Sequence, residues 1–361
     1  MGKSAVKGLF YICLIAATFV LATITIVAAF SGNVAPVDSV IMPLLGLAVP
    51  VLLIANLITA LCWALARKRW ALVPLVAFFC NWGYLTSVFQ LHLPKDKTPA
   101  GKYLKIATYN IHNFGGEITG YSCKEIARYM QQEGVDVLCF QEFGDNSDFP
   151  TDSIRRVLSH WSHALIPSED SVKGVLPIAV FSRYPLANHR FITYQHSSNC
   201  SMMCDVVMGT DTIRLINNHL QTTSVSQKRR KWERELATDD TRREVQAAKD
   251  AAGTLHENFM KRATQTYVIS HYAKTSPYPV LLCGDFNSIP SSYTYHHLRK
   301  TLKDGFRTAG NGYMYTYRYA KRMLRIDYIF HSPSLKGIEY YSPDLDLCSD
   351  HNPVIMEVEI Q

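Results

Sequence analysis

The sequence predicts an α/β domain of about 260 residues that follows three transmembrane helices. Three observations carry this prediction. Long uncharged apolar runs fill the first quarter of the chain, short β-rich segments alternate with helical patterns beyond it, and polar residues recur where the β-rich segments end. With 361 residues and 48% hydrophobic content, the chain has enough apolar mass for a sizeable core and is too apolar to be disordered.

Three apolar runs near the N-terminus are each long enough to cross a bilayer core of about 30 Å, which takes about 20 helical residues. Charge interrupts this region only at Asp38 and in the basic cluster at residues 67–69, both between runs. A cleaved signal peptide is the alternative for the first run, but that run is too long and two more follow. Residues 1–92 are therefore predicted to be embedded in a lipid bilayer, with helices at residues 9–30, 41–66 and 71–91.

The formal net charge of +7 is spread unevenly. Five basic residues and one acidic residue lie before residue 95, so the rest of the chain carries only +3. By the positive-inside rule, the N-terminus and residues 67–69 are predicted to be cytoplasmic. Three crossings then place everything after residue 92 outside the cytoplasm, facing the periplasm from the inner membrane if the source is bacterial.

Two of the nine cysteines, Cys200 and Cys204, lie close together in the sequence. An extracytoplasmic location would permit a disulfide between them. A metal site is less favoured, because no second pair of ligands with suitable spacing accompanies them. Their pairing stays open at this stage.

Residues 93–102 contain two prolines in a polar stretch and are predicted to be a linker, with the catalytic domain at residues 103–361. Helical patterns cover residues 122–132 and a long charged stretch at residues 227–269. The basic cluster at residues 228–231 is interpreted as the solvated face of that helix rather than as a phosphate-binding patch, because acidic residues follow it. The β-rich segments lie at residues 104–109, 135–141, 178–181, 212–217, 280–283, 326–330 and 354–360.

Polar residues follow or open these β-rich segments in a repeated pattern. Side chains at strand ends can converge on one edge of a sheet, which is where α/β enzymes build their sites. Each residue alone could cap a turn or be a satisfied buried side chain. Together they supply what metal-assisted phosphoryl transfer needs: oxygen ligands, a base and donors for developing charge. The set comprises Asn110, Glu142, His219, Asp285, Asn287, Asp327, Asp350 and His351.

The order and the residues of seven motifs resemble those of the endonuclease/exonuclease/phosphatase superfamily. This superfamily includes DNase I, abasic-site endonucleases, sphingomyelinases and inositol polyphosphate phosphatases. The resemblance implies a four-layer sandwich, with two packed β-sheets flanked by helices. The motifs are Thr-Tyr-Asn-Ile (108–111), Leu-Cys-Phe-Gln-Glu (138–142), Ile-Ala-Val-Phe-Ser-Arg-Tyr-Pro (178–185), Asn-His-Leu (218–220), Gly-Asp-Phe-Asn (284–287), Arg-Ile-Asp-Tyr-Ile (325–329) and Ser-Asp-His-Asn-Pro (349–353).

The resemblance also implies a role for each site residue. Glu142 is expected to be the principal Mg²⁺ ligand, with Asn110 and Asp350 helping to define the metal site. Asp285 is expected to orient or deprotonate the attacking water, and Asn287 to hold the phosphate or the nucleophile.

Two histidines are expected to contact the scissile phosphate and to stabilise the transition state or assist the leaving group. They are His219 and His351, the second oriented by Asp327. Imidazole suits this task because its ordinary pKa of about 6.5 allows either protonation state near neutral pH.

One position departs from some members of the superfamily. His112 stands where they carry an aspartate ligand, which leaves a second metal ion open and makes Mn²⁺ an alternative to Mg²⁺. His112 is equally compatible with a position merely beside the site. Arg262 and Gln265, on the long helix, either face the site or, as the favoured interpretation, lie at the surface.

The predicted function is a membrane-anchored, Mg²⁺-dependent phosphoesterase. The alternatives are an extracytoplasmic nuclease acting on DNA or RNA and, less favoured because every motif is filled, an inactive membrane-bound binding module. The substrate stays open among a lipid headgroup, a small phosphoester and nucleic acid, although a net +3 domain lacks the basic stripe usual in nucleases. The tyrosine-rich residues 313–319 either line a substrate pocket or form an alternating strand. No protein partner is predicted.

Overall fold

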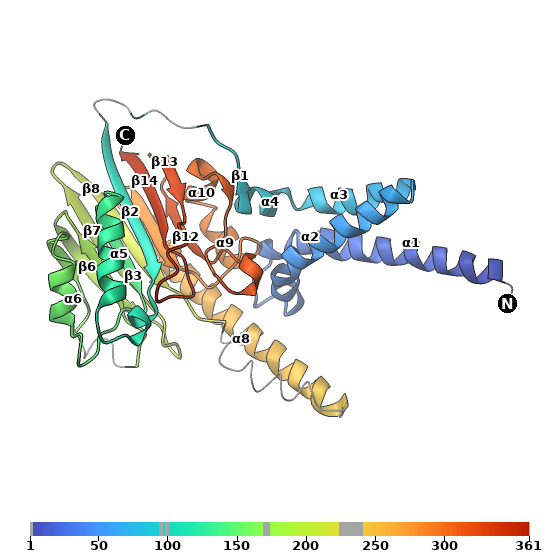
Figure 1. Cartoon of the computed structure of the whole chain (residues 1–361), viewed down its shortest axis with the longest axis horizontal. Coiled ribbons are helices and arrows are strands. Elements are labelled where there is room, and N and C mark those ends of the chain that lie inside the picture. Colours follow the sequence, from blue (N-terminus) through green and yellow to red (C-terminus); the bar gives the residue numbers. More distant parts are fainter. Residues whose placement is uncertain (1–2, 94–96, 98–100, 169–173, 224–240, 361) are drawn as a thin grey trace.

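The structure is a computed structural model that describes residues 3–93, 97, 101–168, 174–223 and 241–360 (Figure 1). The N-terminal helices extend from one side of a body built of two β-sheets and their covering helices. The predicted linker lies largely outside the described residues, and the predicted division into domains is therefore not tested at its boundary.

Two N-terminal helices are long and apolar enough to cross a membrane: α1 (Lys3–Ala28) and α2 (Ile41–Leu65). The third predicted span is not one helix. It consists of α3 (Leu72–Cys80) and α4 (Trp82–Val88), which meet at a bend of 64°, so the described residues hold two such helices, or three if the bent pair is one span. Short 3₁₀ helices, η1 (Ser31–Asn33) and η2 (Arg69–Ala71), lie in the connections.

The bend occurs at Asn81, whose backbone leaves the helical region. Its side-chain amide donates to the carbonyl oxygens of Ala77 and Thr25, both at 3.1 Å. An asparagine side chain that bonds the backbone offers it an alternative to regular helical hydrogen bonding. Residues 71–91, predicted as one transmembrane helix, are thus two helices, which make a third span only if the bent pair crosses as one unit. Hydropathy carries no information on this local competition.

The N-terminal helices pack side by side, and the start of α1 lies at the end remote from the sheets (Figure 1). Hydrogen bonds join them: the Asn56 amide donates to the Thr25 hydroxyl at 2.7 Å, and the Trp63 indole donates to the Thr18 hydroxyl at 2.9 Å. Polar bonds of this kind are typical of helices that associate in lipid. The side of the membrane on which each end lies stays a prediction.

Two six-stranded mixed sheets form the body. The order in the first sheet is β10 (Lys303–Asp304), β12 (Asp327–His331), β9 (Val280–Asp285), β8 (Asp211–His219), β7 (Cys200–Met208) and β6 (Leu186–Thr193). The order in the second is β13 (Leu335–Tyr341), β14 (Val354–Ile360), β2 (Lys102–Asn110), β3 (Val137–Gln141), β5 (Ile178–Ser182) and β4 (His163–Leu165). A separate pair joins β1 (Phe89–Gln90) to β11 (Gly312–Tyr313).

The central core lies between the sheets, where residues such as Ile106 and Cys139 of one sheet meet Leu215 and Cys283 of the other. The outer face of the second sheet packs under α5 (Tyr121–Gln132) and α6 (Thr151–Val157). The outer face of the first packs under α8 (Thr241–Lys274) and α9 (Tyr293–Leu298). The predicted four-layer sandwich is confirmed. The remaining elements are η3 (His112–Gly116), α10 (Gly305–Ala309) and η5 (Ala320–Arg322).

A polar network crosses this apolar core. The buried Gln141 amide donates to Asn217 Oδ1 at 2.6 Å and to Thr108 Oγ1 at 2.9 Å, and Asn217 donates in turn to the carbonyl of Phe140 at 3.1 Å. These hydrogen bonds link the two sheets directly beneath the strand ends.

The sheets and the N-terminal helices are joined by direct contacts. Ser31 Oγ donates to the carbonyl of Ser291 at 2.9 Å, and Ser291 Oγ donates to the carbonyl of Gly46 at 2.7 Å. Arg325 Nη1 donates to the carbonyl of Ser87 at 2.8 Å. These bonds show that the two parts share a packed junction.

Two further expectations concern this part of the chain. The structure describes the long helix α8 over Thr241–Lys274, and the rest of the prediction, residues 227–240 with the basic cluster at residues 228–231, lies outside the described residues. Cys200 and Cys204 are buried free thiols on β7. Four residues along a strand span about 13 Å, which is too far for a disulfide between them.

Candidate active site

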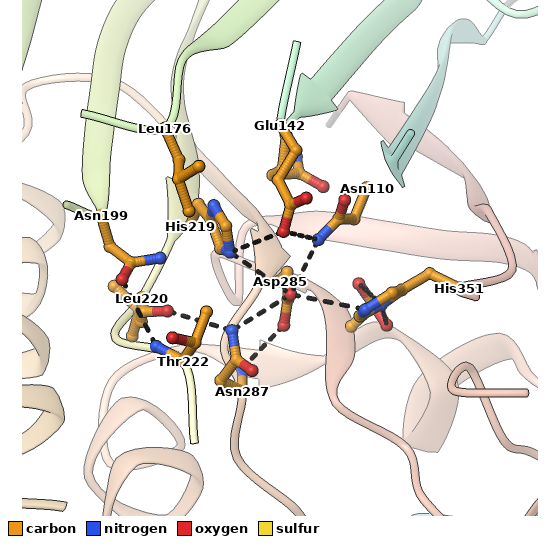
Figure 2. A network of polar contacts seen from close by, with 12 residues as sticks. Asn110, Glu142, Leu176, Asn199, His219, Leu220, Thr222, Asp285, Asn287 and His351 are labelled. Atoms are coloured by element: carbon orange, nitrogen blue, oxygen red, sulfur yellow. Dashed lines mark hydrogen bonds and ion pairs between the residues drawn. The ribbon is translucent and has the colours of Figure 1, made fainter. Parts of the chain in front are cut away.

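Asp285 is the centre of a polar cluster at the ends of the strands (Figure 2). Its carboxylate lies at the end of β9 and is almost wholly buried. Asn110 Nδ2 donates to Asp285 Oδ2 at 3.1 Å, and the Nε2 atoms of His219 and His351 lie 3.7 and 3.8 Å from the same oxygen. Side chains from β2, β8 and the segment before β14 therefore converge on one carboxylate.

Strand register explains this convergence. In the parallel pair β8–β9, His219 is opposite Asp285, and in the antiparallel pair β12–β9, Asp327 is also opposite Asp285. Asn110 is opposite Gln141, the residue before Glu142, in the parallel pair β2–β3. The predicted residues meet because each ends or begins its strand at the same edge of the sandwich.

Sharp turns aim the side chains into the cluster. Glu142 and Asn287 both adopt left-handed backbone conformations, with φ of 48°. The Asn287 backbone donates to Asp285 Oδ1 at 2.8 Å, and its side-chain amide donates to Asp285 Oδ2 at 3.1 Å. Gly284 is required just before, because its φ is 130° and a Cβ there would lie 1.9 Å from the Asn218 carbonyl oxygen.

His219 is fully buried between Glu142 and Asp285, and its Nε2 lies 3.7 Å from a carboxylate oxygen of each. Neither ring nitrogen has a hydrogen-bond partner among the described residues. Burial lowers the pKa of His219, although the neighbouring carboxylates act in the opposite direction. Burying a neutral imidazole without a hydrogen-bond partner destabilises the folded protein. A bound oxyanion would remove this cost by accepting a hydrogen bond from the ring N–H.

His351 forms an ion pair with Asp327, whose Oδ2 lies 3.0 Å from Nδ1. Burial lowers the pKa of His351, but Asp327 and Asp285 outweigh it and raise the pKa to about 10. The ring is therefore an imidazolium at neutral pH, with Nε2 left to face Asp285 and, at 3.9 Å, Asp350. The Tyr317 ring packs edge-on against it, with centroids 5.2 Å apart.

Glu142 lies beside this group. Its Oε1 accepts from Asn110 Nδ2 at 3.2 Å, and its Oε2 lies 3.1 Å from His112 Nδ1. Burial raises the pKa of Glu142, but His219, Asn110 and His112 more than offset this effect and leave the pKa below its ordinary value. Glu142 is thus an anion available to a cation. His112 lies at the solvent-exposed rim, in contact with the predicted ligand.

The donor set fits a divalent cation. Four carboxylates, those of Glu142, Asp285, Asp327 and Asp350, lie in or beside the cluster. The neighbouring cations are His351 and Arg262, so the carboxylates outnumber them. Such an excess of buried negative charge requires compensation. Hard carboxylate and amide oxygens are the ligands that Mg²⁺ prefers.

A second grouping has ligand-bearing atoms within 4.8 Å of one another: Asp285, Asp327 and His351. His351 Nδ1 is already engaged with Asp327, whereas the Glu142 carboxylate is the more accessible to solvent, with 17% of its side chain exposed against 2% for Asp327. The assignment of ligands stays a prediction.

The prediction that Arg262 and Gln265 lie at the surface was wrong. Both are about 2% exposed on the inner face of α8. Arg262 Nη1 donates to the carbonyls of Gln221 and Asn287 and to Thr223 Oγ1, and Gln265 Oε1 accepts from the Gln221 backbone at 2.8 Å. Together they hold the loop after β8 against the loop after β9. The helical spacing of Arg262, Gln265 and Ile269 was the available signal.

The tyrosine-rich segment does not form an alternating strand. Within residues 313–319, only Tyr313 belongs to a strand, the two-residue β11. Tyr317 instead pairs in an isolated bridge with His351 and packs edge-on against its ring. One tyrosine of the segment therefore borders the site.

Two family patterns match the sequence. That of the endonuclease/exonuclease/phosphatase family matches residues 107–351, and that of a domain of unknown function matches residues 9–88. No curated protein matches the chain.

Solved structures share the fold. An endonuclease/exonuclease/phosphatase from Beutenbergia cavernae is 17% identical with a TM-score of 0.52, and the match covers 72% of each chain. Truncated TDP2 from Caenorhabditis elegans is 16% identical with a TM-score of 0.51, over 72% of this chain and 98% of that one. An endonuclease/exonuclease/phosphatase from Bacteroides vulgatus is 16% identical with a TM-score of 0.51, and the match covers 72% of this chain and 100% of that one.

Proposed function

Because the chain belongs to the endonuclease/exonuclease/phosphatase family, we propose that it is a Mg²⁺-dependent phosphoesterase held in a membrane by its N-terminal helices. It hydrolyses a phosphodiester or phosphomonoester by attack of water on phosphorus. One observation carries the proposal: Asn110, His219, Asn287 and His351, from different strand ends, all face the carboxylate of Asp285 (Figure 2).

The charge of each side chain in the cluster determines its role in the proposed reaction. Asp285 orients the water and takes its proton as the oxygen attacks phosphorus. The bond from phosphorus to the leaving oxygen then breaks, and the imidazolium of His351 donates its Nε2 proton to that oxygen. Asp327 keeps the ring in place from the other side. His219, neutral and without a partner, donates to a phosphoryl oxygen as negative charge develops.

The metal ion is expected at Glu142, with Asn110 and Asp350 completing the protein ligands. When bound, a divalent cation neutralises phosphate charge and acts as a Lewis acid. Glu142 lies 3.7 Å from His219, so the same phosphate can contact both the ion and the imidazole.

The test is an assay of the full-length protein in detergent against phosphomonoesters, phosphodiesters, phospholipids and single-stranded DNA, with and without Mg²⁺. Asp285→Asn should lower turnover on the active substrate by about 100-fold to 10,000-fold, the usual value of a general base. The matched control Asp148→Asn changes an exposed loop carboxylate and should leave turnover unchanged. Equal turnover in both variants, or no activity on any substrate class, would contradict the proposal.

The membrane part of the proposal rests on α1, α2 and the bent pair α3–α4. The basic residues 67–69 connect α2 to α3, so the positive-inside rule predicts that this connection is cytoplasmic and that the sheets are outside. A reporter that is active only in the cytoplasm, fused to Gln361, should be silent. The same reporter placed in the 67–69 connection should be active, and the reverse result would overturn the topology.

A further inference from the structure

A basic pocket of about 330 Å³ lies away from the candidate active site. Its walls come from β10, α10, the end of β12 and β13. His331, in its lining, is four residues beyond Asp327 on β12, which places the pocket about 13 Å along the strand from the catalytic cluster. The lining residues that matter here are His92, Lys303, Arg307, Thr308, His331 and Lys336.

Every charged residue that lines this pocket is basic. Lys336 is paired with Glu359 at 2.8 Å, and Arg307 donates one bond to the Gly83 carbonyl at 3.2 Å. The Lys303 ammonium forms no hydrogen bond or ion pair with any described residue. Within the described part of the chain, the positive charge in the pocket therefore exceeds what neighbouring carboxylates neutralise.

The histidines form the wall rather than the binding groups. His331 is buried, its Nδ1 lies 2.9 Å from the Ser332 carbonyl, and its Nε2 lies 3.0 Å from Thr308 Oγ1. Burial lowers the pKa of His331. The positive charge in the pocket therefore comes from Lys303 and Arg307.

The pocket adjoins the N-terminal helices. Arg307 bonds to Gly83 of α4, and His92 follows β1 and bonds to the Gly310 carbonyl at 2.7 Å through Nδ1. Trp82 and Leu91, next to these two positions in the sequence, are 60% and 79% exposed. Exposed tryptophan and leucine beside cations are typical of a membrane–water boundary.

We propose that this pocket binds the phosphate group of an anionic ligand, through Lys303 and Arg307. Two sources supply the same chemistry: the headgroup of an anionic phospholipid and free phosphate. The lipid source rests on the proposed membrane placement of the N-terminal helices, whereas phosphate binding does not. The site is separate from the catalytic cluster, so its occupant is not the hydrolysed group.

The experiment uses the full-length protein in neutral detergent with EDTA and measures binding calorimetrically. The probes are inorganic phosphate, short-chain phosphatidylglycerol and short-chain phosphatidylcholine. Lys303→Met is compared with Lys300→Met, which removes an exposed lysine three residues away that does not line the pocket. The catalytic cluster is the same in both variants, so a difference in affinity reports the pocket.

Lys303→Met should weaken phosphatidylglycerol binding about fivefold, since one basic residue near an anionic headgroup contributes about that factor. Lys300→Met should bind as the parent does, and Lys303→Arg, which keeps the charge, should retain affinity. Weakening for phosphatidylglycerol alone identifies a lipid site, and weakening for inorganic phosphate as well identifies a general phosphate site. Equal affinities for Lys303→Met and Lys300→Met, or equal loss with phosphatidylcholine, would overturn the proposal.

Discussion

Two buried ion pairs begin only two residues apart in the chain, at Arg325 and Asp327, and they differ in what surrounds them. Arg325 pairs with Asp304, and both side chains are wholly buried. It also donates to Tyr340 Oη and to the Ser87 carbonyl, and the Phe306 ring lies 4.9 Å from its guanidinium carbon. Asp327 pairs with His351, whose Nε2 faces only carboxylates 3.8 to 3.9 Å away.

The difference separates a structural pair from a functional one. Arg325 donates hydrogen bonds to the Asp304 carboxylate and to the Ser87 carbonyl, and it thereby joins the first sheet to α4. His351 keeps one donor free at an edge where other strand ends meet. The two pairs have similar chemistry, but protein groups accept from both terminal nitrogens of Arg325, whereas Nε2 of His351 is left for the ligand that the proposed function requires.

Arg325→Met should produce the largest loss of stability, about 3–5 kcal/mol in the free energy of unfolding. It leaves the buried Asp304 carboxylate without its cation. Denaturant unfolding in detergent measures this loss. The double variant with Asp304→Asn should recover part of it, since no unpaired charge remains. If the denaturation midpoint of Arg325→Met equalled that of the parent protein, the Arg325–Asp304 pair would not have the structural role given to it here.

His351→Ala should lower turnover by about 100-fold to 1000-fold while costing much less stability than Arg325→Met. Burial raises the pKa of Asp327 to about 6, so this carboxyl takes up a proton more readily than an ordinary aspartate once the imidazole is gone. Turnover and unfolding are measured on the same sample. Added Mg²⁺ should not restore turnover, and full rescue by metal would refute the role given to His351.

Glu142→Gln should fail in a different way, because it removes the charge of the predicted metal ligand. The apparent affinity for Mg²⁺ should fall by at least about 10-fold, the loss seen when mere partners of metal ligands are changed. Excess Mg²⁺ should then recover part of the turnover. The measurement is turnover against Mg²⁺ concentration. If the maximal turnover fell while the Mg²⁺ concentration for half-maximal turnover stayed the same, the result would argue against metal binding at Glu142.

Asp327→Asn should have the smallest effect, a loss of about 10-fold in turnover, because the ring remains but is poorly oriented. Asp327 raises the pKa of His351, so its removal should lower that pKa and move the alkaline limb of the pH–turnover profile to lower pH. In the parent, the stabilisation from protonated His351 is complete below about pH 6.5 and is lost as the pH rises through about 10. An unshifted alkaline limb in Asp327→Asn would show that the carboxylate does not tune the imidazole.

The residues of the candidate site were predictable to different degrees. Asn110, Glu142 and Asp285 follow apolar strands, so local sequence pattern located them. Arg262 was misplaced, because a charged residue on a helix is exposed unless its hydrogen-bond partners are known. Those partners, at Gln221, Thr223 and Asn287, come from two loops distant in the sequence.

The sequence by itself located the β-rich segments, the apolar N-terminal runs and the strand-end residues, because hydrophobic periodicity and turn chemistry are local properties. The layers were implied by the family resemblance. Only the tertiary structure decided the rest. It bent the third apolar segment at Asn81, separated the task of Arg325 from that of Asp327, and placed Lys303 and Arg307 in one pocket beside α4. These outcomes depend on pairings between segments far apart in the chain. Register and side-chain packing select such pairings, and no local window of sequence contains them.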